Sequence, residues 1–136
     1  MAMVFADTSY WIALLNPHDE LHARAFKISR ELRAANIVTS EMVLVELLNS
    51  FSDAGGGLRE AAAIAIETMR QRTEVKIVPQ TSEQFEYALQ RYKKAADKSW
   101  SITDCASFQI MEEAGIRIAA TYDRHFLQAG CEAILR

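Results

Sequence analysis

The sequence predicts an α/β fold, in which a central parallel sheet of four to five strands is covered by helices on both faces. Short apolar runs alternate with longer segments of helical period along the chain, and strands connected in this way pair in parallel. The chain has 136 residues, 50% of them hydrophobic, which suits one domain spanning residues 1–136. It contains no internal repeat, low-complexity segment or linker that would divide it.

Short apolar runs bounded by polar or breaking residues predict the strands. The third run is stopped by Pro79, which has no backbone N–H to donate to a neighbouring strand. The strands are placed at residues 3–6, 37–39, 75–78 and 116–120, with a last one at 131–135.

Apolar residues at three- and four-residue steps predict helices between these strands. Asp19 and Ser40 stand where each can cap a helix, and Thr81 has Gln84 at capping-box spacing. Three glycines beginning at Gly55 form a turn between two helices. The helices are placed at about residues 9–15, 20–35, 41–51, 58–69, 82–96 and 102–114, with a helical turn at 126–127.

The charge and cysteine content exclude several classes of protein. A net charge of -3 does not suit a strongly basic nucleic-acid-binding protein, but an acidic metal site within a locally basic surface remains compatible with a nuclease. Cys105 and Cys131 are too few for a disulfide framework and match no zinc pattern. With no signal-peptide pattern and no apolar run of membrane-spanning length, we expect a cytoplasmic protein without membrane association.

Four acidic residues are the candidate functional groups, because each lies next to an apolar segment where an unpaired charge is costly. Asp7 and Asp123 each follow a predicted strand, and parallel sheets bind ligands beyond the carboxyl ends of their strands. Glu46 and Asp104 lie on predicted helices and reach the same place only if those helices face it. Such a gathering of carboxylates predicts a divalent-metal site.

Each acid also has a structural interpretation. Asp7 can cap the helix that follows it, and Asp104 has the spacing of a capping box. Glu46 can point to solvent on a narrow polar stripe, and Asp123 can pair with Arg124 at the surface. It is the combination of the four that favours a functional site.

Other polar and aromatic residues give weaker signals. His125 stands beside the predicted site and could contact phosphate, but none of the three histidines has the spacing of a metal-ligand pair. Trp11 and Trp100 are expected to pack in the core. A basic cluster indicates either a solvated helix face or an RNA-facing surface; its members are Arg91, Lys93, Lys94 and Lys98.

The four acids and their neighbours resemble the motifs of the PIN-domain nucleases, and in particular the bacterial VapC-type toxins. The matching segments are Asp7-Thr8-Ser9, Val45-Glu46-Leu47, the run 101–106 that contains Asp104, and the run 121–126 that contains Asp123. They keep the family's order and spacing over nearly the whole chain. The resemblance implies a three-layer α/β/α fold, a ribonuclease activity that depends on Mg²⁺ or Mn²⁺, and control by an antitoxin protein.

The resemblance also implies the roles of single residues. Asp7, Glu46, Asp104 and Asp123 are expected to hold the metal and to carry catalysis, and oxygen ligands of this kind suit Mg²⁺ or Mn²⁺. Ser9 is expected to position the first acid or the scissile phosphate, and Thr103 to cap its helix and orient the third acid. VapC-like proteins commonly form homodimers, and apolar residues of the helices at 20–35 and 58–69 could supply the interface.

Three alternatives remain open. A phosphatase like the haloacid dehalogenases requires a second aspartate two residues after Asp7, where this chain has Ser9. A stand-alone RNA-processing nuclease would use the same acids, and a non-catalytic RNA- or protein-binding domain would use the fold only as a scaffold. Transfer, ribosomal and messenger RNA are all possible targets, because target choice depends on surface shape and loops.

Overall fold

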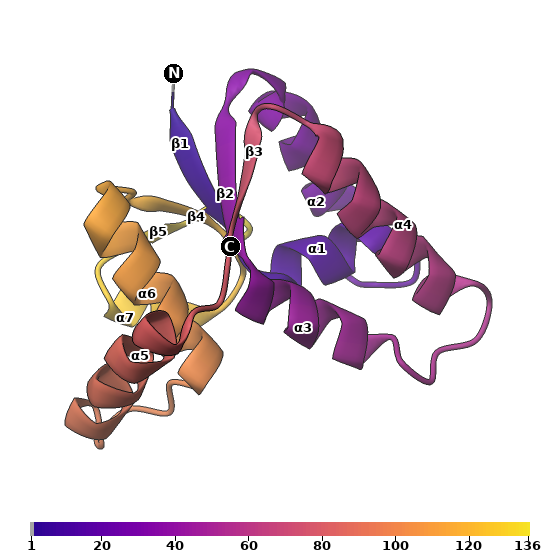
Figure 1. Cartoon of the computed structure of the whole chain (residues 1–136). Coiled ribbons are helices and arrows are strands. Elements are labelled where there is room, and N and C mark those ends of the chain that lie inside the picture. The colour runs from indigo at the N-terminus through magenta and orange to yellow at the C-terminus, as the bar shows by residue number, and fades with distance from the viewer. Residues whose placement is uncertain (1) are drawn as a thin grey trace.

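The computed structural model, which describes residues 2–136, contains one five-stranded sheet in which all strands run parallel. The strand order is β3-β2-β1-β4-β5, so the first strand lies in the centre of the sheet (Figure 1). This confirms the predicted fold class. The strands are β1 (Met3–Ala6), β2 (Asn36–Ser40), β3 (Val75–Val78), β4 (Ile118–Ala120) and β5 (Glu132–Ala133).

Helices cover both faces of this sheet, as expected for three layers. Figure 1 shows α1 to α4 gathered on one side and α5 and α6 packed side by side on the other. The helices are α1 (Thr8–Leu15), α2 (His22–Glu31), α3 (Glu41–Ser50), α4 (Leu58–Gln71), α5 (Ser82–Lys94), α6 (Ile102–Ala114) and α7 (Arg124–Gln128). No helix among the described residues is long and apolar enough to cross a membrane.

Element boundaries differ from the predicted ones where local side-chain bonds intervene. Asp19 was expected to cap the second helix, but its Oδ1 accepts from the Leu21 N–H at 2.9 Å and closes a turn that precedes α2. A 3₁₀ turn, Leu32–Ala34, then ends the helical segment earlier than predicted. The predicted strand at 131–135 shrinks to two residues, because β5 can pair only with the three-residue strand β4.

The core lies between the helices and the central strands, and it fixes the position of both tryptophans. Phe5 and Phe108 are far apart in the sequence, but both are buried in one cluster. Trp11 is only 6% exposed and donates from Nε1 to Thr39 Oγ1 at 3.4 Å. Trp100 meets Phe108 edge-on, with ring centroids 4.9 Å apart. The predicted packing role of both tryptophans is confirmed.

The strand register brings two distant segments together at one edge of the sheet. Ala6 at the end of β1 pairs with Ala120 at the end of β4, and the Asp7 N–H donates to the Ala120 carbonyl at 3.1 Å. Asp7 and Thr121 therefore leave the sheet side by side. Because carboxyl ends of parallel strands meet at the same edge, this is the place where a ligand site is expected.

Candidate metal centre

Asp7 is buried at the end of β1, and its side chain is held by hydroxyl groups. The residue is 4% exposed, and its Oδ2 accepts from Thr121 Oγ1 at 2.9 Å and from Ser9 Oγ at 3.5 Å. Asp7 occupies the N-cap position of α1, yet its carboxylate makes no capping hydrogen bond. Helix capping by the carboxylate therefore does not explain this acid, and Ser9 is one of its two hydroxyl neighbours.

The charge of Asp7 is poorly compensated. Burial raises the pKa of Asp7 to about 7, and hydrogen bonds from the Thr8 backbone and Thr121 only partly oppose it. The nearby carboxylates of Asp104 and Glu46 contribute to the same rise, after burial. No lysine or arginine within residues 2–136 forms an ion pair with Asp7. A cation would supply the charge that the side chains lack.

Asp104 begins α6 and has both a structural and an electrostatic role. The Asp104 N–H donates to Ser101 Oγ and the Ser101 N–H donates to Asp104 Oδ2, each at 3.0 Å, so the predicted capping box is present. The helix cap is thus Ser101, and the expectation that Thr103 caps this helix was wrong. Thr103 lies buried inside the first turn, where its carbonyl accepts from Ser107 Oγ at 2.8 Å.

The pKa of Asp104 is also raised, first by burial and then by the charge of Asp123. The Ser101 backbone bond and the His125 imidazole act in the opposite direction. Asp104 is 7% exposed, so its charge, like that of Asp7, is removed from water at this edge of the sheet.

His125 joins Asp104 to Asp123. Its Nδ1 lies 3.0 Å from Asp104 Oδ2 and 3.2 Å from Asp123 Oδ1. Asp123 caps α7, because its Oδ1 also accepts from the His125 N–H at 2.9 Å. The surface pair with Arg124 is not found among the ion pairs of the described residues.

These three residues form a group that could hold a metal. Asp104, Asp123 and His125 each offer one ligand atom, and these atoms lie within 4.8 Å of one another. Sequence reasoning considered His125 only as a phosphate contact, since no second histidine stands at ligand spacing. The available signal was the Asp-x-His spacing across a short helical turn, which folds the imidazole back onto its own capping aspartate.

Glu46 is not a member of this group and lies near Asp7 instead. It is half-buried on α3, and its Oε1 accepts from Thr8 Oγ1 at 2.5 Å. Its effect on the pKa of Asp7 places it in the same electrostatic environment. The bond to Thr8 contradicts the alternative of a side chain that points freely into solvent.

Thr121 was missed by sequence reasoning, although it connects the site. It is fully buried, and its Oγ1 donates to Asp7 Oδ2, accepts from the Asp123 N–H at 3.0 Å and lies 3.0 Å from Ser9 Oγ. One hydroxyl thus fixes the first and fourth acids relative to each other. Its only sequence signal is a threonine placed between a strand and Asp123.

The chemistry of the donor set fits a divalent cation. Most of the possible ligand atoms are carboxylate oxygens, with one imidazole nitrogen from His125. The buried carboxylates of Asp7 and Asp104 form no ion pair with a lysine or arginine of residues 2–136. Hard divalent ions prefer such oxygen ligands. The residues present therefore support the predicted metal site in general terms.

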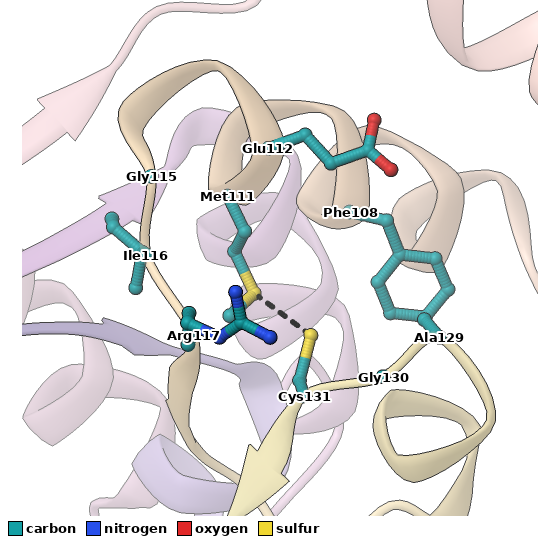
Figure 2. A pocket seen from close by; sticks show the side chains of 9 residues that line it. All are labelled: Phe108, Met111, Glu112, Gly115, Ile116, Arg117, Ala129, Gly130 and Cys131. Carbon is teal, nitrogen blue, oxygen red and sulfur yellow. Dashed lines mark hydrogen bonds between the residues drawn. The ribbon is translucent and has the colours of Figure 1, made fainter.

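A separate cavity lies away from these acids. Figure 2 shows it between the end of α6 and the segment from α7 to β5, with Arg117 and Glu112 at its opening. Cys131 Sγ and Met111 Sδ are 3.9 Å apart inside it. None of the four predicted acids lines this cavity, so it has no part in the metal centre.

Comparison with known proteins gives results that agree with this geometry. The family model of the PIN domain matches residues 4–130, which include all four acids and His125. The chain is similar to the 23S rRNA-specific endonuclease VapC20 of Mycobacterium tuberculosis, strains CDC 1551 and H37Rv. The identity is 30% over 128 residues, which make up 94% of this chain and 95% of the relative.

Two solved structures resemble the fold. The crystal structure of Mycobacterium tuberculosis VapC20, described as a Sarcin-Ricin loop cleaving toxin, has a TM-score of 0.83 and 29% sequence identity. The alignment covers 94% of this chain and 95% of that one. FitAcB from Neisseria gonorrhoeae has a TM-score of 0.67 at 18% identity, covering 96% and 95% of the two chains, and this likeness concerns the fold alone.

Proposed function

This chain belongs to the PIN-domain family, and from that membership we propose that it is a divalent-metal-dependent endoribonuclease that acts as the toxin of a VapBC-type toxin–antitoxin pair. The resemblance predicted from its four motifs is confirmed by the family match. The observation that carries the proposed activity is the group of Asp104, Asp123 and His125, with Asp7 at the same edge of the sheet.

We assign Asp7, Glu46, Asp104 and Asp123 to metal binding and catalysis, and add His125 to the group. The four acids would hold the ion through carboxylate oxygens, and Thr8 fixes the carboxylate of Glu46 by a hydrogen bond. When bound, Mg²⁺ or Mn²⁺ supplies a water of lowered pKa and offsets charge that develops on the phosphate. The predominance of carboxylate oxygens favours these two ions.

The remaining polar residues keep the acids in position. Thr121 and Ser9 donate to Oδ2 of Asp7 and hold its side chain in place. The Ser101 N–H and His125 hold Asp104 through its Oδ2 in the same way. Positioning of this kind lowers the reorganisation needed when RNA binds. Thr103 supports Asp104 only as a buried neighbour in the same helical turn.

We propose RNA as the substrate and 23S ribosomal RNA as the first one to test, because the relatives of known specificity cleave it. Membership in the VapC group further implies an antitoxin partner and a homodimer in the cytoplasm. The sheet joins residue 3 to residue 133, which supports a single domain over 1–136. Hydrolysis is expected to leave a 5′-phosphate and a 3′-hydroxyl.

The experiment is cleavage of a labelled 23S rRNA fragment that contains the sarcin–ricin loop, with Mn²⁺ or Mg²⁺ and then with EDTA. Asp7→Asn and Asp104→Asn should abolish cleavage, whereas Asp53→Asn, at an exposed acid outside the four motifs, should leave it intact. Calorimetric titration with Mn²⁺ gives a second readout. RNA binding without any metal-dependent cleavage would favour the non-catalytic alternative, and cleavage of precursor RNA without toxicity would favour the processing enzyme.

A further inference from the structure

An apolar groove lies between α5 and the start of α6, outside the residues assigned above. It has a volume of about 840 Å³ and is lined by residues of α5 from Phe85 to Lys93 and by the loop that leads to α6. Its aromatic and basic lining consists of Phe85, Tyr92, Lys93, Lys98 and Trp100.

Aromatic rings are presented to solvent in this groove. Phe85, Leu89 and Tyr92 follow one another at helical steps along the same face of α5. The side chain of Tyr92 is 51% exposed, and its hydroxyl has no hydrogen-bond partner within residues 2–136. Trp100 is fixed at the other wall, because its Nε1 donates to Gln128 Oε1 at 2.9 Å. Large exposed rings without a structural partner indicate a binding surface.

All charges that line the groove are positive. They belong to Lys93 and Lys98, and no carboxylate lines the groove. Lys98 has only the exposed Asp97 at 3.5 Å, while Lys93 has no acid within ion-pair distance in the described chain. In a chain of net charge -3, this local excess of positive charge complements a polyanion.

One residue links the lining of the groove to the metal centre. Ser101 lines the groove and also exchanges two backbone-to-side-chain hydrogen bonds of 3.0 Å with Asp104. A strand whose phosphate reaches the acids would therefore place its neighbouring nucleotides against Tyr92 and Trp100.

We propose that this groove binds unpaired bases of the RNA strand next to the scissile phosphate, an inference that rests on the proposed function. Tyr92 stacks on a base, and Lys93 and Lys98 contact the adjoining phosphates. Aromatic faces flanked by lysines bind single-stranded nucleic acid with little sequence preference, because every base has a π-face. The groove would thus require that the target be single-stranded beside the cut.

The test is binding of a short, unstructured, fluorescein-labelled oligoribonucleotide in EDTA, which separates binding from cleavage. Tyr92→Ala should weaken binding by roughly 5- to 150-fold, the range expected for loss of one stacked base, whereas Tyr92→Phe should restore it. Lys93→Ala should reduce the slope of log affinity against log salt by about 0.7. Quenching of Trp100 fluorescence gives an internal readout, since the other tryptophan, Trp11, is buried.

Matched controls lie on the same helix. Tyr87 is 48% exposed and Lys94 adjoins Lys93, but neither lines the groove. Tyr87→Ala should change the RNA affinity by less than about twofold, and Lys94→Ala by less than about threefold. Neither side chain would contact the RNA strand. Equal losses in the two tyrosine variants, or no binding by the wild-type protein, would overturn the proposal.

Parallel measurements separate this inference from the proposed function. Metal-dependent cleavage that is unchanged in Tyr92→Ala would refute the groove while leaving the nuclease in place. Groove-dependent binding without any cleavage would refute the nuclease and retain the groove. Light scattering and RNA binding together test a different occupant. If Tyr92→Ala converts a dimer to a monomer while the RNA affinity per protomer stays unchanged, the groove is an interface between two copies and the RNA proposal is overturned.

Discussion

Replacing Asp7 with asparagine should stabilise the metal-free protein, although it removes a proposed metal ligand. Asp7 is 4% exposed, and the carboxylates of Asp104 and Glu46 add to the unfavourable effect of its burial. Asparagine has nearly the same shape, carries no charge, and its Oδ1 can still accept from Thr121. The substitution therefore removes a buried charge and keeps the hydrogen bond that positions the side chain.

The magnitude follows from the pKa of Asp7, which rises from 3.8 in a free chain to about 7 in the folded protein. The folded state binds the proton more tightly, so this group costs no stability well below pH 3.8, where both states are protonated, and destabilises the fold increasingly as pH rises to about 7. Above that pH the cost reaches about 4 kcal/mol at most. Relaxation of the site lowers this cost. If Asp7→Asn recovers half of it, about 2 kcal/mol, Tm should rise by about 6–8 °C in a domain of this size.

The assay is thermal unfolding followed by circular dichroism in EDTA at pH 8 and at pH 4. The difference in free energy of unfolding between Asp7→Asn and the wild type should be largest at pH 8 and fall below about 1 kcal/mol at pH 4. Asp53→Asn, at an exposed acid, is the control and should stay within about 0.5 kcal/mol of the wild type. Mn²⁺ should raise the wild-type Tm more than that of Asp7→Asn. An Asp7→Asn protein no more stable than the wild type at pH 8 would refute the reasoning.

Three further substitutions test how the site is held. Ser101→Ala should cost about 0.5–2 kcal/mol in denaturant unfolding and also lower the kcat of RNA cleavage, because the capping box orients Asp104; stability lost without any change in kcat would contradict this. Thr121→Val should cost about 1–3 kcal/mol and weaken Mn²⁺ binding to Asp7, and Thr121→Ser should restore both. His125→Ala should weaken Mn²⁺ binding about tenfold or more in calorimetry, and unchanged affinity would remove it from the ligand group.

Much of the fold could be predicted from local sequence signals. Ser40 and Ser101 accept from the third backbone N–H of the helices they cap, as their spacing predicted. The segments before Asp7 and Asp123 were predicted as strands, and the residues just after parallel strands lie at one edge of a sheet. The two acids could therefore be expected at the same edge of the sheet, but their closeness depends on β1 and β4 being neighbours.

The finer geometry could not be predicted, because it depends on the strand register and on packing. The pairing of Ala6 with Ala120 decides that Thr121 donates to Asp7, and no local pattern contains that information. The position of His125 depends on the turn at the start of α7, and that of Glu46 on the rotation of α3. The groove beside Tyr92 exists only after α5 has packed against α6.

The hydrogen bond from Thr121 to Asp7 joins residues 114 positions apart in the chain. Because β1 pairs with β4, the central strand finds one of its two neighbours only when residues 118–120 have been made. A partly synthesised chain consequently carries Asp7 but lacks the residues that complete its surroundings. During translation the site would stay incomplete until β4 has been made, and a fragment that ends at residue 115 should bind no Mn²⁺.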